Sequence, residues 1–160
     1  MPASSVARGT TLPALLRGTT ELDQSIAIGE TAAWVRSFSS EDVLNFAHLS
    51  GDHNPVHLDE IAASRSPFGS RVVHGLLAAS QFSALIASKL PGPGSIYLEQ
   101  TLRFLRPIHL GEAVEYTLRV IEVPKPRVYR LETIARVVSE AEPALSGIAV
   151  VLAPRQPPIA

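Results

Sequence analysis

Apolar and polar positions alternate with a period of two through most of the second half of the chain. Such alternation is typical of antiparallel strands that have one buried face and one solvated face. Together with an apolar segment around Trp34, it predicts strands over residues 31–38, 95–106, 113–123, 127–138 and 145–152. In the segment 95–106 the alternation places Ile96, Leu98, Leu102 and Phe104 on one apolar face.

The segment from Leu76 to Leu90 has a different pattern. It is apolar on nearly every side of a helix and carries no charge before Lys89, so we predict the longest helix over residues 74–90. The Pro-Gly-Pro-Gly sequence that follows ends it. A helix without a polar face must be surrounded by protein. One strand, a buried helix and a series of long strands therefore predict an α+β fold, in which a curved antiparallel sheet wraps around a long central helix.

Shorter signals divide the rest of the chain. Ser39 stands three residues before Asp42, which is the spacing of a capping box, and predicts a short helix that ends near Leu49. Residues 59–63 are expected to add one helical turn. Residues 1–26 show no sustained period and are expected to form an extended arm. Residues 27–153 then form a single domain, and residues 154–160, which are rich in proline, form a loose tail.

Composition narrows the classes of function. The 160 residues carry 14 basic and 15 acidic side chains, a balance that gives no global electrostatic reason to bind nucleic acid or an anionic membrane. The chain contains no cysteine, which excludes disulfides, thiolate metal sites and a cysteine nucleophile. No apolar run is long enough to span a membrane, and the first residues lack the apolar core of a secretory signal. We therefore expect a cytoplasmic protein.

Histidines and aspartates are concentrated in one part of the chain. Between positions 48 and 74 lie His48, Asp52, His53, His57, Asp59 and His74. One interpretation is a metal site, in which His53 and His57 bind the ion together with Asp52 or Asp59. Another is that the acidic residues form turns and the histidines are solvated loop residues, as we expect for His48, His53 and His109.

A third interpretation makes Asp52 and His57 a catalytic pair. The two residues are five apart across Pro55, and a turn there lets both side chains point into one cleft and hold one water molecule. A carboxylate can accept a proton and an imidazole can donate one near neutral pH. This combination suits the addition of water to an activated double bond. Spacing alone leaves all three interpretations open.

The order of residues in this region resembles a known motif. The sequence contains Ser50-Gly51-Asp52-x-Asn54-Pro55-x-His57-x-Asp59, Phe68-Gly69, Val73-His74-Gly75, Leu102-x-Phe104-x-x-Pro107 and Leu110-Gly111-Glu112. It resembles the hydratase motif of the MaoC-like, (R)-specific enoyl-CoA hydratases over about residues 29–123, although Glu112 stands where that family more often has Asp. The resemblance implies the hot-dog fold, in which a curved antiparallel sheet surrounds a long helix.

The resemblance also implies roles for particular residues. Asp52 and His57 would bind and activate the water, and which of them is the base is left open. Gly75 would donate its backbone N–H to the thioester carbonyl. This role agrees with its place at the start of a helix, where N–H groups lack partners and the helix dipole is positive. The other residues would support the site: Asn54 within the loop, Ser83 beside the acyl pocket, and His74.

The implied activity is the reversible syn addition of water to a trans-2-enoyl-CoA, which yields the (R)-3-hydroxyacyl-CoA. It needs no metal or redox cofactor, because the thioester activates the double bond and coenzyme A is part of the substrate. Two alternatives keep the same fold: an acyl-CoA thioesterase, and a non-catalytic acyl-CoA-binding or dehydratase-partner subunit. Polyester precursor supply and fatty acid oxidation are both compatible with the family.

The predicted fold favours a homodimer. A single sheet has two edges that invite pairing, and it covers only part of an apolar helix. A second copy related by a two-fold axis covers both. We expect coenzyme A to bind at or near the subunit boundary, where cations would meet its phosphates. The candidates are Arg103, Arg106, Lys125 and Arg127.

Overall fold

The computed structural model describes residues 26–155 of the chain. The expected arm over residues 1–26 and the tail over 154–160 therefore fall almost entirely outside the described residues. The elements follow one another as β1 (Thr31–Arg36), α1 (Ser40–Ser50), α2 (Pro55–Leu58), α3 (Glu60–Ser64), α4 (Gly75–Ser88), β2 (Ile96–Phe104), β3 (Val114–Lys125), β4 (Val128–Val137) and β5 (Leu145–Leu152). Every strand predicted from the alternation is present, with ends that differ by two residues or fewer.

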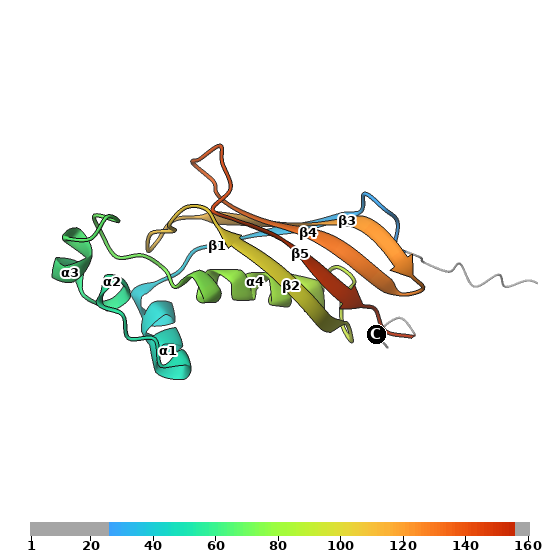
Figure 1. Ribbon diagram of the computed structural model, residues 1–160, viewed down its shortest axis with the longest axis horizontal. Helices are drawn as coiled ribbons and strands as arrows, with labels where there is room; N and C mark the ends of the chain where they lie inside the picture. Colours follow the sequence, from blue (N-terminus) through green and yellow to red (C-terminus); the bar gives the residue numbers. More distant parts are fainter. Residues whose placement is uncertain (1–25, 156–160) are drawn as a thin grey trace, which may run out of the picture.

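The strands form one five-stranded antiparallel sheet in the order β1-β3-β4-β5-β2. The helix α4 lies along one face of this sheet, and α1, α2 and α3 are grouped beyond one end of it, next to the start of α4 (Figure 1). This is the predicted α+β arrangement around a central helix. No helix within residues 26–155 is long and apolar enough to cross a membrane.

The core lies between α4 and the side of the sheet that faces it. Alternate residues of β3 and β4, such as Tyr116, Leu118 and Leu131, are fully buried there. From the helix, Phe82 and Leu85 are fully buried, and the ring of Phe82 meets the edge of Tyr116 with centroids 5.5 Å apart. Burial of each such large apolar side chain stabilises the fold by about 1.5–3 kcal/mol. These contacts therefore fix the position of α4 on the sheet.

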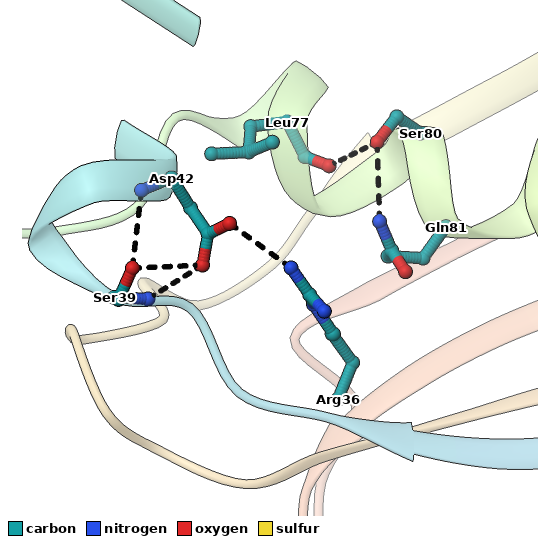
Figure 2. Close-up of polar contacts among 6 residues, drawn as sticks. All are labelled: Arg36, Ser39, Asp42, Leu77, Ser80 and Gln81. Atoms are coloured by element: carbon teal, nitrogen blue, oxygen red, sulfur yellow. Dashed lines mark hydrogen bonds and ion pairs between the residues drawn. The ribbon is translucent and has the colours of Figure 1, made fainter. Parts of the chain in front are cut away.

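Only one side of α4 is covered by its own chain. Phe82 faces the sheet, but Leu76 is 63% exposed and Ser83 is exposed as well. Ser80, also exposed, donates a hydrogen bond of 2.6 Å to the Leu77 carbonyl within the helix (Figure 2). A single chain therefore covers α4 only on the side that faces the sheet. The prediction that protein surrounds this helix is met on that side and not on the other.

The strand β2 differs from the alternation predicted for it. A bulge at Leu98 sets two steps of β2 against one step of β5, and side chains change face at that point. Tyr97 and Leu102 consequently pack against the core. Ile96 and Leu98 are each 54% exposed. The prediction that Ile96, Leu98, Leu102 and Phe104 share one apolar face was wrong for Ile96 and Leu98, because a strict period of two does not continue through a bulge.

The helix α1 is joined to the end of β1 by the predicted capping box. Ser39 Oγ accepts the Asp42 N–H at 3.1 Å, and the Asp42 carboxylate accepts the Ser39 N–H at 2.8 Å (Figure 2). The bond from the Ser39 N–H, supported by the charge of Arg36, holds the pKa of Asp42 below its usual value, because both stabilise the carboxylate. Arg36 forms an ion pair with Asp42 at 3.0 Å. The start of α1 is thus anchored to an edge of the sheet.

Gly147 in β5 gives a sharp test of the packing between β5 and β2. A Cβ at this position would lie 1.8 Å from the carbonyl oxygen of Thr101, so the backbone of one strand would have to move. We expect Gly147→Ala to lower the free energy of unfolding by about 2 kcal/mol or more and Tm by about 4–8 °C. Ser146→Ala, one residue away on the outer face, should change the free energy by less than about 1 kcal/mol. Equal melting temperatures for the two variants would contradict this register.

Candidate active site

The loop between α1 and α2 presents Asp52. The helix α1 ends at Gly51, whose φ of +80° is a left-handed conformation that glycine adopts without steric cost. Oδ1 of the next residue, Asp52, accepts the Asn54 N–H at 3.1 Å. Asn54 then caps α2 by accepting the Val56 N–H at 3.3 Å, with Pro55 in the first helical position. The helix α2 was not predicted from the sequence, although an N-cap residue followed by proline is a signal for a helix start.

His57 lies in the last turn of α2 and is half-buried. Its Nδ1 is 2.8 Å from the carbonyl oxygen of Val72. Because a carbonyl can only accept, this contact requires the hydrogen to be on Nδ1 and leaves Nε2 free to exchange a proton. Arg71 holds the same helix in place, since its Nε donates to the His57 carbonyl at 2.7 Å and its Nη1 donates to Ser40 Oγ at 2.8 Å.

His74 stands immediately before α4 and is only 2% exposed. Its Nε2 is 3.0 Å from the carbonyl oxygen of Asp52, so Nε2 carries a hydrogen and donates it. The His74 ring also stacks on the His57 ring, with centroids 3.8 Å apart and planes at 27°. Burial lowers the pKa of His74, because desolvation disfavours the charged imidazole. His74 therefore contacts both members of the predicted catalytic pair.

Asp52, His57 and His74 form one cluster, in which one nitrogen or oxygen atom from each side chain lies within 4.8 Å of the others. The cluster brings together the two residues predicted to act on water. A carboxylate and two imidazoles are also ligands that zinc accepts. The metal interpretation drawn from the sequence combined His57 with His53 and with Asp52 or Asp59, and did not include His74. Within residues 26–155, His53 is exposed outside this cluster, and Asp59 is occupied as the N-cap of α3.

A cavity of about 460 Å³ lies beside the cluster. Its polar wall includes Asn54, His57, Gly75 and Arg106. The rest of the wall is mainly apolar and comes from Val56, Phe68, Val72, Val73, Ala78, Phe104, Leu105, Pro107, Ile108 and Leu145. A concave, mostly apolar cavity with a few convergent polar groups is the usual form of a site for a small organic ligand.

Gly75 is the first residue of α4, so its N–H has no partner inside the helix and lies at the positive end of the helix dipole. A Cβ at Gly75 would lie only 2.6 Å from Cε1 of Phe104. The absence of a side chain therefore lets the Phe104 ring lie directly on the start of α4, in the cavity wall. Phe104 was missed as a site residue, and the signal that contains it is Leu102-x-Phe104-x-x-Pro107.

The remaining predicted residues are not all at this cavity. Arg106 lines it, but Arg103 lies on the outer face of β2 opposite Ser146. Lys125 lies in the β3–β4 hairpin, at the other end of the sheet. Ser83 is two turns along α4, on the exposed side of the helix. The cavity thus includes Asn54, His57, Gly75 and Arg106 from the predicted set, with Asp52 and His74 in the adjoining cluster.

The other histidines differ in their surroundings. His48 and His53 are exposed, as expected. His109 is half-buried instead of fully solvated: its Nδ1 is 2.8 Å from Ser70 Oγ, and its backbone forms a β-bridge with Val72. His109 therefore helps to hold the segment that supplies the carbonyl partner of His57.

The chain belongs to the MaoC-like domain family, which matches residues 20–141. It is 40% identical over 134 residues to the 3-hydroxybutyryl-CoA dehydratase of Methylorubrum extorquens, a match that covers 83% of this chain and 84% of the relative. It is 37% identical over 131 residues to the (R)-specific enoyl-CoA hydratase of Aeromonas caviae, covering 82% of this chain and 98% of the relative.

Two solved structures of R-hydratases are also similar to this chain. The (R)-hydratase from A. caviae involved in PHA biosynthesis superposes with a TM-score of 0.79 at 39% identity, over 82% of this chain and 99% of that one. An R-hydratase of Pseudomonas aeruginosa superposes with a TM-score of 0.75 at 39% identity, over 84% and 92% of the two chains. The predicted family and hot-dog fold are confirmed, and the relatives support the predicted hydro-lyase activity.

The contact between Gly75 and Phe104 can be tested directly. Gly75→Ala places a methyl group against the Phe104 ring, which is 55% exposed and can rotate away. We expect Tm to change by less than about 4 °C. The displaced ring and the added methyl should lower kcat/KM for an enoyl-CoA by about tenfold or more. Adding Phe104→Leu should recover part of the loss, and an unchanged kcat/KM for Gly75→Ala would contradict the contact.

Proposed function

We propose that this protein is an (R)-specific enoyl-CoA hydratase, which adds water reversibly to a trans-2-enoyl-CoA and forms the (R)-3-hydroxyacyl-CoA. One observation carries the proposal: the Asp52 carboxylate and the His57 imidazole share a cluster within 4.8 Å, beside a largely apolar cavity. Two relatives named (R)-specific enoyl-CoA hydratase, 35% and 37% identical over 82% of the chain, support the same assignment.

The proposed step is a syn addition to the C2–C3 double bond of the substrate. One water molecule is held between the Asp52 carboxylate and Nε2 of His57. For the reaction the pair carries one exchangeable proton, so that one group is unprotonated and the other is protonated. The unprotonated group removes a proton from the water while the water oxygen bonds to C3. The electron pair of the double bond moves toward the thioester and then forms the C2–H bond with the proton of the protonated group, and the proton taken from the water restores the one proton of the pair. Because both groups hold the same water, both new bonds form on one face of the substrate.

Gly75 supplies the electrostatic part of the proposed reaction. Negative charge develops on the thioester oxygen as water adds, and a backbone N–H at the start of α4 can donate to it. The Phe104 ring lies against Gly75, in the same wall of the cavity as this donor. The apolar part of the wall, which includes Ala78 and Leu145, is suited to the acyl chain.

Arg106 is the cation that we assign to a phosphate of coenzyme A. It is a charged residue of the cavity wall, and its ion pair with Glu140 is long, at 3.5 Å, with both side chains partly exposed. Such a pair contributes little to stability and can exchange for a phosphate. Arg103 and Lys125 lie on other parts of the sheet, and we assign them no role at the cavity of their own chain. The proposed reaction uses no metal ion or redox cofactor, because coenzyme A is part of the substrate.

Crotonyl-CoA is the first substrate to assay, because it is the enoyl thioester that corresponds to the 3-hydroxybutyryl-CoA in the name of one relative. We expect loss of the enoyl thioester absorbance without release of free thiol. Asp52→Asn and His57→Gln should each lower kcat by at least about 100-fold, because each removes one proton-transfer group. Glu60→Gln and His48→Gln, on exposed neighbouring residues, should keep kcat within about threefold of the wild type.

Several outcomes of this assay would contradict the proposal. Release of free thiol would indicate the acyl-CoA thioesterase. Binding without turnover would indicate an acyl-CoA-binding or dehydratase-partner subunit.

Dialysis against a chelator should leave kcat unchanged. A loss of activity that added zinc restores would instead favour a metal mechanism at Asp52, His57 and His74.

We further propose that the working unit is a homodimer joined through the β2 edge. The strand β2 ends the sheet and exposes Ile96 and Leu98, each by 54%. The uncovered side of α4, with Leu76 at 63% exposure, is a second surface that a partner would bury. Pairing of two copies about a two-fold axis covers an edge and a helix side together.

Sedimentation at micromolar concentration should give a mass about twice the 17.1 kDa of one chain. Leu98→Lys, which adds a charge on the β2 edge, should shift the protein toward the monomer and lower activity. Val123→Lys, on an exposed apolar residue of β3, is the matched control and should leave the dimer intact. A fully active wild-type species of 17.1 kDa would contradict the dimer.

A further inference from the structure

We infer that His74 is a positioning residue, which holds Asp52 and His57 in place for proton transfer while it remains a neutral imidazole itself. The inference rests on the proposed hydratase function, since it concerns the two residues that act on water there. His74 is 2% exposed and does not belong to the cavity wall, although both of its chain neighbours, Val73 and Gly75, do. Its contacts are therefore with other side chains and the backbone, and not with the substrate.

The first contact fixes the backbone of Asp52. This residue is exposed in a loop, and its other hydrogen bonds join it to residues within two positions, namely Ser50 and Asn54. The hydrogen bond from His74 Nε2 to the Asp52 carbonyl, 3.0 Å long, comes from 22 residues away. It is the bond that ties the Asp52 peptide to the start of α4, and hence to the Gly75 N–H. The carboxylate and the proposed oxyanion donor are thereby kept at a constant separation.

The second contact fixes the plane of the His57 ring. The ring of His74 stacks on it at 3.8 Å, while the Val72 carbonyl accepts its Nδ1–H at 2.8 Å. Phe46 of α1 packs against His74 at a centroid distance of 5.0 Å and a tilt of 56°. Rotation of the His57 ring would break the stack or the hydrogen bond. Nε2 of His57 is therefore held in one direction, as a general acid or base requires.

The surroundings of His74 require it to be neutral. Its Nε2–H is donated to a carbonyl, and its Nδ1 is buried without a hydrogen-bond partner among the described residues. A proton on Nδ1 would create a buried, unpaired N–H, which is costly. The charged and titratable groups around it are His57 and His53, which oppose a positive charge, and Asp52, which favours it. The aromatic neighbour, Phe46, adds no charge.

Two substitutions separate the two contacts. His74→Phe keeps an aromatic ring between Phe46 and His57 but removes the donor to Asp52. His74→Gln keeps an N–H donor but removes the ring. We expect His74→Phe to lower kcat by about tenfold or more with KM within about threefold, because the chemical step loses its alignment. His74→Gln should recover part of that loss. His48→Gln, at an exposed histidine, is the control and should keep wild-type kcat.

A spectroscopic measurement tests the neutral state without reference to activity. In ¹⁵N NMR of the wild-type protein, His74 should show the neutral tautomer with hydrogen on Nε2, and should keep it when the pH is lowered below the ordinary imidazole pKa of about 6.5. Titration of His74 at or above this ordinary value, or hydrogen on Nδ1, would overturn the inference, as would a His74→Phe variant with wild-type kcat. If the wild type hydrates no enoyl-CoA, the proposed function fails, while the NMR result still decides the state of His74. If His74→Phe does not fold, His74→Gln and the NMR measurement decide the matter.

Discussion

The packing of α4 on the inner face of the sheet is the constraint on which the rest of the structure depends. Phe82 and Leu85 are fully buried against strand residues such as Tyr116, and their burial sets where the helix lies on the sheet. Because the helix begins at Gly75, a backbone N–H and the positive end of the helix dipole are presented at one end of the sheet. The short helices α1 to α3 are grouped at that same end (Figure 1). The packing that forms the core therefore also places the start of α4 at the site.

Backbone carbonyls determine the chemistry of the two histidines in the cluster. The Val72 carbonyl selects the Nδ1–H form of His57, and the Asp52 carbonyl selects the Nε2–H form of His74. His57 is half-buried and has a free nitrogen beside the cavity, whereas His74 is buried without access to it. Two side chains of one type are therefore suited to different tasks, proton transfer and alignment, because their exposure and hydrogen-bond partners differ.

Much of the fold could be predicted from local patterns, and the errors have local causes. The capping box at Ser39 and Asp42, the helix of α4 and the strand positions are all present. The bulge at Leu98 was not predictable from the alternation, because it depends on how β2 pairs with β5. For the site, the motif identified Asp52, His57 and Gly75. Motif order could not tell that Arg103 faces away from the cavity, since this depends on which face of β2 lies beside the cavity: Phe104 lines it, and the neighbouring Arg103 points to the other side.

The sequence by itself determined which residues form helices and strands, because periodicity is a property of neighbouring positions. Residue type and order along the chain likewise determined which family the chain resembles and which side chains can carry acid–base chemistry. Only the tertiary structure decided which of those side chains meet. The bonds from His57 to Val72 and from His74 to Asp52 span 15 and 22 residues. The contact of Phe104 with Gly75 joins a strand to a helix. Such contacts depend on how α4 and the loop pack at the end of the sheet, and packing between distant segments leaves no periodic signal in the chain.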